Sequence, residues 1–383
     1  MLQLPEWYAA ALSRTAGVNL ASPKALREIA PVVKYLSARF MRQEDAIPEN
    51  YFSDAQIRRA YLTYFFTTNV LKITKPLDEL SLSGFFDGRT ALRALDIGSG
   101  VGTAVAGLWM WLAGRHPAMQ LDVTATDASQ QACREAEQAI SIFREYLQSP
   151  ILKFRSVVVP IEKLGGEISG KYDVLIAQNV LVESPRFTEI IVFAQNVLAE
   201  NGAIILIEPA SRFGSRNLLT FRDALTAAGY TIYAPCVRQG DCPALEKKTD
   251  WCHAVSRWTR PPFIRIIDEE TGTLRLSLKY SYVVAMKEKR NIGQLLQGET
   301  GEDSTLYRVV SERMDEKGRK KFFGCGTNGR LLFEKQKRDT TPEIKDFDSA
   351  ERYDLVRISG TGSKGAMQRI RKDGAAKVVR KWE

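Results

Sequence analysis

Short apolar runs alternate with longer amphipathic segments between residues 90 and 234. The runs have the length and composition of buried strands, and they lie at residues 92–97, 121–126, 154–159, 172–177, 203–207 and 230–234. The amphipathic segments that predict helices lie at residues 103–113, 129–147, 186–198 and 215–228. Strands and helices in this alternation indicate βαβ units and a doubly wound parallel sheet.

The residues before this region have the spacing of helices. Apolar positions recur every three or four residues over 23–42 and 54–73. Ser22-Pro23 and Ser53-Asp54 resemble helix starts. We therefore expect a helical cap ahead of the sheet.

The chain after Pro235 changes character twice. It is irregular through Pro262 and then rich in predicted strands, at residues 263–267, 273–278, 280–286, 305–310, 321–325 and 330–333. Glycines and charged turns separate these strands, a pattern typical of a small barrel or meander. The basic tail at 369–372 and 380–382 is expected to be disordered when the protein is alone.

These patterns predict an α/β protein with four parts. They are a helical cap (1–80), a Rossmann-like domain (81–235), a cysteine-rich segment (236–262) and a basic β-rich domain (263–383). The 383 residues, 44% of them hydrophobic, are enough for a large core and a second, smaller one. The N-terminus has no basic and apolar leader, and no apolar run reaches about 18 residues. We expect no membrane association and a cytoplasmic location, or the mitochondrial matrix if the source is eukaryotic.

Positive charge is concentrated in the C-terminal part of the chain. Residues 1–235 hold 23 Lys and Arg against 23 Asp and Glu, whereas residues 236–383 hold 31 against 22. The whole net charge of +9 therefore lies in the last 148 residues. A basic excess confined to one region favours binding to a polyanion such as RNA.

A glycine-rich loop follows the first strand of the predicted sheet. The sequence runs from Asp96 through Ile97 to Gly98, Ser99, Gly100, Val101 and Gly102. Its spacing is G-x-G-x-G after an acid, not the G-x-G-x-x-G of dinucleotide-binding proteins. This version resembles motif I of class I methyltransferases, which bind S-adenosylmethionine.

An acid at the end of the next strand strengthens this interpretation. Asp127 stands 25 residues beyond Gly102, where a carboxylate can accept hydrogen bonds from both ribose hydroxyls. In class I enzymes the loop after the third strand often brackets the adenine, which points to Ile161. The candidate cofactor-binding residues are Asp96, Gly98, Ser99, Gly100, Gly102, Asp127, Ala128, Ile161, Gln178 and Asn179.

The catalytic residues are not evident from the sequence. Methyl transfer requires an in-line approach of nucleophile and sulfonium, and a base only for some acceptors. The fourth strand ends in Gln178-Asn179-Val180-Leu181, not in the Asn/Asp-Pro-Pro-Tyr/Phe of many enzymes that methylate exocyclic amines. No cysteine occupies the usual position for covalent methylation of a pyrimidine carbon.

Five cysteines without a secretory leader indicate thiol chemistry instead of disulfides. Cys236, Cys242 and Cys252 are separated by five and nine residues, and Cys325 is the most plausible fourth thiol. These gaps exceed the two to four residues typical of zinc knuckles but suit an iron–sulfur cluster. His253 is a competing ligand, and the fifth cysteine, Cys133, has no assigned role. Free buried cysteines remain an alternative at this point.

Several segments together resemble one family. They are the Cys-Pro-rich segment at 234–243, Asp250-Trp251-Cys252-His253, the strand Tyr280-Ser281-Tyr282-Val283-Val284, and the upstream glycine loop. In combination they resemble the methyltransferase-like proteins of the mitochondrial small ribosomal subunit and their bacterial relatives. The resemblance implies that Cys236, Cys242, Cys252 and Cys325 hold a [4Fe–4S] cluster. It also implies a role in maturation of the small subunit, with its RNA as partner and the protein bound as a monomer.

Two functions follow from these features, and a third is disfavoured. The protein methylates ribosomal RNA, or it is an inactive S-adenosylmethionine-binding factor for small-subunit assembly. A nicotinamide-dependent oxidoreductase fits poorly, because the glycine spacing differs and only His116 and His253 supply imidazole groups.

Overall fold

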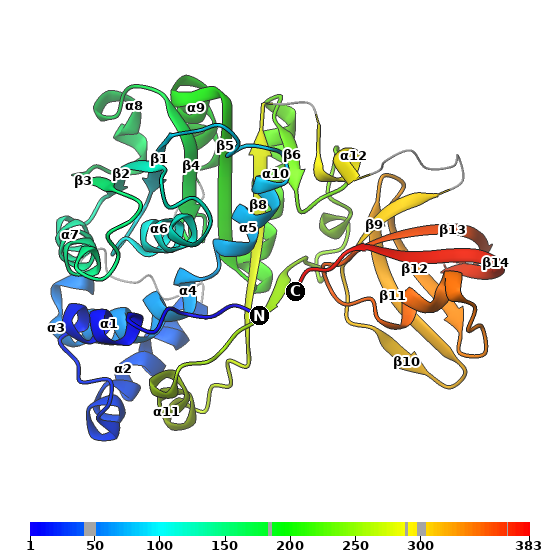
Figure 1. Cartoon of the computed structure of the whole chain (residues 1–383), viewed down its shortest axis with the longest axis horizontal. Helices are drawn as coiled ribbons and strands as arrows, with labels where there is room; N and C mark the ends of the chain where they lie inside the picture. The colour runs from blue at the N-terminus through cyan, green and yellow to red at the C-terminus, as the bar shows by residue number, and fades with distance from the viewer. Residues whose placement is uncertain (42–50, 183–185, 288–289, 297–303, 366) are drawn as a thin grey trace. The chain divides into compact units, whose positions relative to one another are not determined.

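The computed structural model describes residues 1–41, 51–182, 186–287, 290–296, 304–365 and 367–383. They form two compact units that interleave along the chain (Figure 1). The first unit contains Met1–Leu77, Phe86–Ile207 and Arg257–Leu278. The second contains Asp78–Phe85, Glu208–Ser256 and Lys279–Glu383.

A parallel sheet is the centre of the first unit. Its strands are β1 (Ala91–Ile97), β2 (Gln120–Asp127), β3 (Leu152–Val158), β4 (Tyr172–Gln178) and β5 (Leu198–Pro209). They lie in the order β3-β2-β1-β4-β5, and each neighbouring pair is parallel. The apolar runs thus formed the predicted strands, since β1, β2 and β4 are buried over most of their length. The predicted parallel sheet is confirmed.

Helices connect these strands as the periodicity predicted. They are α6 (Thr103–Arg115), α7 (Gln130–Arg144), the short α8 (Leu164–Glu167) and α9 (Phe187–Val197). Helix α7 buries one face, with Ala136, Ile140 and Phe143 in the core. Helix α6 is buried along most of its length. Gly107 allows α6 to pack closely on Ile73, because a Cβ at this position would lie only 2.7 Å from Ile73 Cγ2.

The helical cap packs on this layer (Figure 1). It consists of α1 (Tyr8–Ala16), α2 (Pro23–Met41), α3 (Ala55–Ala60), the π-helix η2 (Tyr61–Phe66), α4 (Thr67–Val70) and α5 (Thr74–Ser81). The aromatic rings of Trp7 and Tyr8 contact Phe143 of α7 edge-on. The helices predicted over 23–42 and 54–73 are confirmed, and only residue 42 lies outside the described residues.

Two predicted strands are wrong. Residues 263–267 belong to helix α11 (Pro262–Thr271), which packs against α2 through the Arg27–Glu270 ion pair at 2.9 Å. A short apolar run does not distinguish a strand from a helix by itself. Pro262 at the first helical turn and the left-handed Gly272 at the end define this helix. The strand predicted at 273–278 is also wrong over most of its length, because β8 (Ser277–Met286) begins only at Ser277.

The second unit begins with α10 (Arg212–Ala227) and β6 (Thr231–Ala234). Strand β6 is antiparallel to β8, and β7 (Ala254–Arg257) also pairs with β8. Between β6 and β7 the chain forms only the 3-10 turn η4 (Pro243–Leu245), as expected for the irregular cysteine segment. The short helix α12 (Ile292–Leu296) follows β8.

A small closed barrel completes the second unit. Its strands are β9 (Thr305–Val309), β10 (Met314–Glu316), β11 (Arg319–Gly326), β12 (Gly329–Gln336), β13 (Leu355–Lys364) and β14 (Met367–Arg380). Strand β9 pairs with both β11 and β13, which closes the ring β9-β11-β12-β14-β13. Only β12 and β14 are parallel, and the 3-10 helix η5 (Pro342–Asp348) lies between β12 and β13. This order and the single parallel pair are the topology of an OB-fold.

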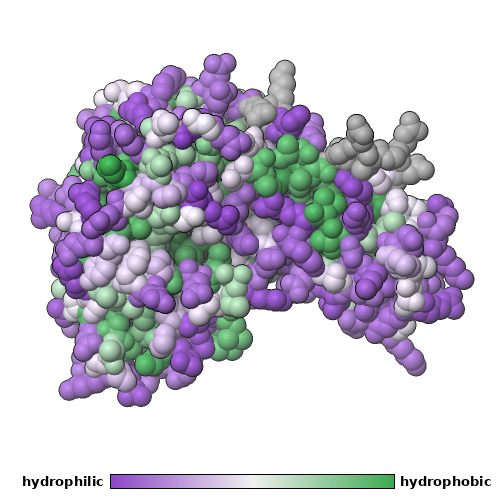
Figure 2. All heavy atoms as spheres, in the orientation of Figure 1, coloured by the Kyte–Doolittle hydropathy of each residue, from purple (hydrophilic) through white to green (hydrophobic). Residues whose placement is uncertain are grey.

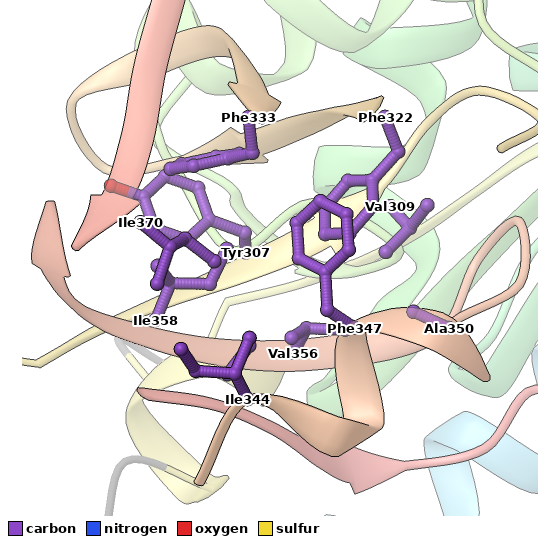
Figure 3. Close-up of a cluster of buried hydrophobic side chains, with 11 residues drawn as sticks. Tyr307, Val309, Phe322, Phe333, Ile344, Phe347, Ala350, Val356, Ile358 and Ile370 are labelled. Carbon is purple, nitrogen blue, oxygen red and sulfur yellow. The ribbon is translucent and has the colours of Figure 1, made fainter. Parts of the chain in front are cut away.

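The barrel interior is filled by aromatic and branched side chains (Figure 3). Phe322 stacks on Phe347 at 4.4 Å, and Tyr307 meets Phe333 edge-on at 4.6 Å. The tail predicted to be disordered is instead ordered, because β14 completes the ring and Trp382 is buried. No helix within the described residues is long and apolar enough to span a membrane.

Candidate functional site

The ends of three neighbouring strands meet in the first unit. Ile97 of β1 is in register with Thr126 of β2 and Ala177 of β4. The strand order reverses between β1 and β4, which is the place where open α/β sheets bind ligands. The glycine loop, Asp127 and Gln178 therefore belong to one edge of the sheet.

The glycine loop adopts a conformation that requires glycine. Gly98 and Gly100 have φ of 63° and 53°, in the left-handed region. A Cβ on Gly98 would lie 2.7 Å from Val180 Cγ2, whereas a Cβ on Gly100 would have no atom within 4 Å. Gly102 is the N-cap of α6. The backbone at Gly100 thus faces open space, which allows a ligand to approach closely.

Asp127 holds the loop by hydrogen bonds. Its Oδ2 accepts from the Gly100 N–H and its Oδ1 from the Ser129 N–H, both at 2.8 Å. Each carboxylate oxygen has two acceptor sites, so each keeps one after these bonds. Burial raises the pKa of Asp127, while these two hydrogen bonds oppose the rise. The carboxylate is fixed in position and retains the capacity to accept from two ribose hydroxyls.

Buried polar atoms without a hydrogen-bond partner in the structure gather at the same edge. They are both carboxylate oxygens of Asp96, Ser99 Oγ, Gln178 Oε1 and Asn179 Oδ1. Buried polar groups in proteins almost always have a partner, so these atoms indicate a polar ligand. Burial, and then the charge of Asp127, raise the pKa of Asp96 well above its usual value. A cation beside Asp96 would reverse this shift, and the amino group and sulfonium of S-adenosylmethionine are cations.

The remaining predicted residues occupy the same region. Ala128 is exposed just after β2, and Ile161 is half-buried in the 3-10 turn η3 (Ile161–Lys163) after β3. Gln178 donates to the Asn69 carbonyl at 3.0 Å, which connects the sheet edge to the cap. Asn179 has a φ of 62°, a strained conformation for a residue with a side chain. Such strain is common where a side chain must be aimed at a ligand.

The four predicted cysteines come together in the second unit. Cys236, Cys242, Cys252 and Cys325 line a single cavity of about 50 Å³, several times the space that one water molecule needs. Among the described residues, no group of three or more His, Cys, Asp or Glu side chains is arranged to hold a metal ion. The thiols therefore share a cavity without converging on one point. His253, the competing ligand, does not line this cavity in the described part of the chain.

Arginines surround the cysteine cavity. Arg222, Arg238, Arg308 and Arg330 all line it, and no Asp or Glu does so in the described part of the chain. Burial raises the pKa of the Cys325 thiol to about 12 and also raises the pKa values of Cys242 and Cys252. The surrounding guanidinium groups would offset the negative charge that these thiols acquire when they bind a metal.

Two arginines hold the cysteine segment in place. Arg216 donates to the carbonyl oxygens of Ala244, Lys247 and Asp250, at 2.8 to 3.2 Å. Arg330 forms an ion pair with the Asp250 carboxylate. The loop between Cys242 and Cys252 is therefore held by side chains from α10 and β12.

A buried polar network adjoins the cavity. Arg308 lies 2.8 Å from Glu79 and donates to the carbonyl oxygens of Pro235 and Tyr353. The Tyr353 hydroxyl lies 3.4 Å from Cys252 Sγ. Tyr353 has a φ of 74° and is almost fully buried. Sequence reasoning missed Arg308, Glu79 and Tyr353, because they are far apart in the chain and belong to no motif.

Cys133 lies apart from this cavity, in α7 of the first unit. Its Sγ is 3.8 Å from the Val157 carbonyl oxygen, and burial raises the pKa of its thiol to about 11. It is a buried, protonated side chain in the core.

A family model and several solved structures match the chain. The model of the family described as mitochondrial small ribosomal subunit Rsm22 matches residues 58–340, which is more than half of the chain. No curated protein matches the chain.

Similar solved structures are methyltransferases at low sequence identity. Magnesium protoporphyrin IX methyltransferase (ChlM) from Synechocystis PCC 6803 with bound SAM is 15% identical, covers 66% of this chain and 90% of its own, and has a TM-score of 0.34. The plantazolicin methyltransferase BamL in complex with SAH is 12% identical, with 69% and 99% covered and a TM-score of 0.38. The Methanococcus jannaschii fibrillarin pre-rRNA processing protein is 15% identical, with 53% and 69% covered and a TM-score of 0.32. The substrates named for these three proteins are not assigned to this chain.

Proposed function

Because this chain belongs to the family of mitochondrial small ribosomal subunit Rsm22, with a Rossmann-like class I methyltransferase fold in its first unit, we propose that it binds S-adenosylmethionine and methylates RNA of the small ribosomal subunit. One observation carries the cofactor assignment. The buried, unpartnered carboxyl of Asp96 lies at the same sheet edge as the open backbone of Gly100 and the fixed carboxylate of Asp127.

Each group has a role in binding. Asp127 would accept from the ribose hydroxyls, and Asp96 and Ser99 would meet the polar groups of the methionine part. The loop from Gly98 to Gly102 would let the backbone approach the cofactor without side chains in the way. Ile161 and Ala128 would lie beside the adenine. The bound cofactor supplies an electrophilic methyl group, and the chain's residues position the acceptor in line with it.

Asn179 and Gln178 are the polar groups available to an acceptor at the end of β4. Asn179 presents a buried amide oxygen from a strained backbone. An amide oxygen accepts a hydrogen bond but is a weak base. Such a site suits an acceptor that needs orientation more than deprotonation.

The second candidate function is an inactive assembly factor that keeps S-adenosylmethionine as a structural part. The observation that favours it is Gln178-Asn179-Val180-Leu181 in place of the tetrapeptide found in many amine methyltransferases. Under this alternative, the cofactor stabilises the fold that the small subunit recognises. RNA of the small subunit is the partner in both cases, and the protein acts as a monomer there.

Labelled cofactor distinguishes the two functions. We expect purified protein to transfer tritiated methyl groups from S-adenosylmethionine to immature small subunits, and Gly100→Leu to abolish the transfer. Gly114→Leu, on the exposed end of α6 with no atom within 4 Å of its Cβ, is the control. No transfer by the wild-type protein, with assembly defects in cells carrying Gly100→Leu, would support the inactive factor instead.

We also propose that the four cysteines hold an iron–sulfur cluster. Their thiols line one cavity with four arginines, three of which (Arg222, Arg308 and Arg330) are also paired with carboxylates that do not line it. A tetrahedral zinc site brings its sulfur atoms to within about 3.8 Å of one another, since each Zn–S bond is about 2.3 Å. A cubane tolerates a wider set of thiols. We therefore assign a [4Fe–4S] cluster to Cys236, Cys242, Cys252 and Cys325, with zinc as the alternative.

Metal analysis tests this assignment. Anaerobic purification should give a brown protein with about four irons per chain. Cys242→Ser should lose the iron, while Cys133→Ser, a buried cysteine of the first unit, should keep it. Stoichiometric zinc without iron would refute the cluster. We place the protein in the cytoplasm, or in the mitochondrial matrix if its source is eukaryotic.

A further inference from the structure

The outward face of the barrel in the second unit carries a row of side chains that the cofactor site does not use. Phe322 and Phe333 point into the core and are cross-strand partners (Figure 3). Side chains alternate along a strand, so Phe323 and its partner Leu332 point outward. Both are half-buried, and strand β14 continues the row because Met367 pairs with Leu332. The centre of this face is therefore apolar.

Cations surround this apolar centre. At one end, Arg319, Lys321 and Arg369 all lie within 4 Å of the carboxylate of Glu334, and Lys321 also lies 2.7 Å from the Glu316 carboxylate. Three cations against two carboxylates leave a local excess of one positive charge. At the other end, the Arg330 guanidinium, which is paired with Asp250, has its carbon 4.8 Å from the centre of the Phe323 ring. The surface of the barrel is largely hydrophilic in Figure 2.

We infer that this face, formed by β11, β12 and β14, binds single-stranded RNA, with a base stacked on Phe323 and phosphates on Arg369 and its neighbouring cations. The inference rests on the proposed RNA partner and specifies where that partner binds. An unpaired base presents an apolar ring that can stack on an aromatic side chain, whereas a duplex hides it. The excess of 31 basic over 22 acidic residues in 236–383 supplies the matching charge.

The barrel topology supports this choice of face. In an OB-fold the second and third strands carry the ligand, and these strands are β11 and β12 here. Cys325 lies two residues beyond Phe323 on the same side of β11, so one strand serves both the RNA face and the cysteine cavity. Loss of the cysteine-bound group would thus disturb the end of the RNA face.

Fluorescence anisotropy with the full-length protein and a labelled, unstructured RNA of about 12 nucleotides tests the inference, because one OB-fold covers about 4 to 16 nucleotides. We expect Phe323→Leu to weaken binding by about 5- to 150-fold, the range for loss of one base–aromatic stack. Phe323→Tyr keeps the ring and should bind like the wild type. Arg369→Gln should lower the slope of log affinity against log salt by about 0.7.

The control removes the same charge elsewhere on the barrel. Lys377 is exposed on β14 where that strand pairs with β13, away from β12. Lys377→Gln should change the affinity by less than about twofold. Wild-type affinity in Phe323→Leu, or preference for a duplex of the same sequence, would overturn the inference and leave the proposed function standing. Failure of the wild-type protein to bind any RNA would overturn both.

Discussion

Replacement of Asp127 by Asn separates cofactor binding from folding. In the structure each carboxylate oxygen of Asp127 accepts one backbone N–H at 2.8 Å, from Gly100 and from Ser129. Asn keeps one acceptor oxygen and replaces the other by a donor. The new NH₂ group must face one of the two backbone N–H groups, which then loses its partner.

The size of the effect follows from the bonds lost. One ribose hydroxyl loses a hydrogen bond to a charged acceptor, which is worth about 1.5–3 kcal/mol. Disturbance of the loop adds about 1 kcal/mol, the net value of an ordinary hydrogen bond. Asp127→Asn should therefore weaken S-adenosylhomocysteine binding by about 2.5–4 kcal/mol, or about 60- to 700-fold at 1.4 kcal/mol per tenfold.

Isothermal titration calorimetry measures this change. Asp122→Asn is the matched control, because Asp122 lies on the same strand with an exposed side chain 4.0 Å from Arg93. The control should bind within about twofold of the wild type. If Asp127→Asn also bound within threefold and melted normally, Asp127 would not be the ribose partner.

Three further changes probe other parts of the structure. Burial raises the pKa of Asp96, and the charge of Asp127 raises it further. The cationic cofactor favours the charged form of Asp96. Cofactor affinity should therefore rise with pH until the pH exceeds that raised pKa, and Asp96→Asn should flatten the rise in a calorimetric pH series. Gly107→Ala should lower the free energy of unfolding by about 1–3 kcal/mol through overpacking. Gly114→Ala in the same helix should raise it by about 0.5–1 kcal/mol. Urea denaturation measures both values, and equal effects would contradict the close approach of Ile73 to Gly107. Glu79→Gln leaves Arg308 buried without its counter-ion and should lower that free energy by about 3–5 kcal/mol. Glu79→Leu combined with Arg308→Met should recover only part of the loss, because the buried carbonyl oxygens of Pro235 and Tyr353 then lose the Arg308 donor. A neutral single variant would contradict the buried pair.

The Rossmann-like sheet was predictable because its signals are local. Each strand is a buried apolar run, and the glycine loop and Asp127 directly follow two of them. The convergence of Gln178 with this loop needed only the rule that parallel strands end at one edge.

The rest depends on contacts between distant segments. The run at 263–267 has no local feature that excludes a strand, and its helix is defined by packing on α2. The basic tail has few apolar residues, yet it is ordered because β14 closes the barrel and Trp382 stacks on Tyr282. Arg308 and Tyr353 join the cysteine cavity from β9 and the loop before β13, and no spacing in the sequence connects them to the cysteines.

Crosslinking in cells of the source organism, followed by sequencing of the bound RNA, tests the central claim most directly. The tagged protein should crosslink to RNA of the small ribosomal subunit. Phe323→Leu should reduce these crosslinks more than Lys377→Gln does. Crosslinks spread over unrelated RNAs, without enrichment of the small-subunit RNA, would contradict the account.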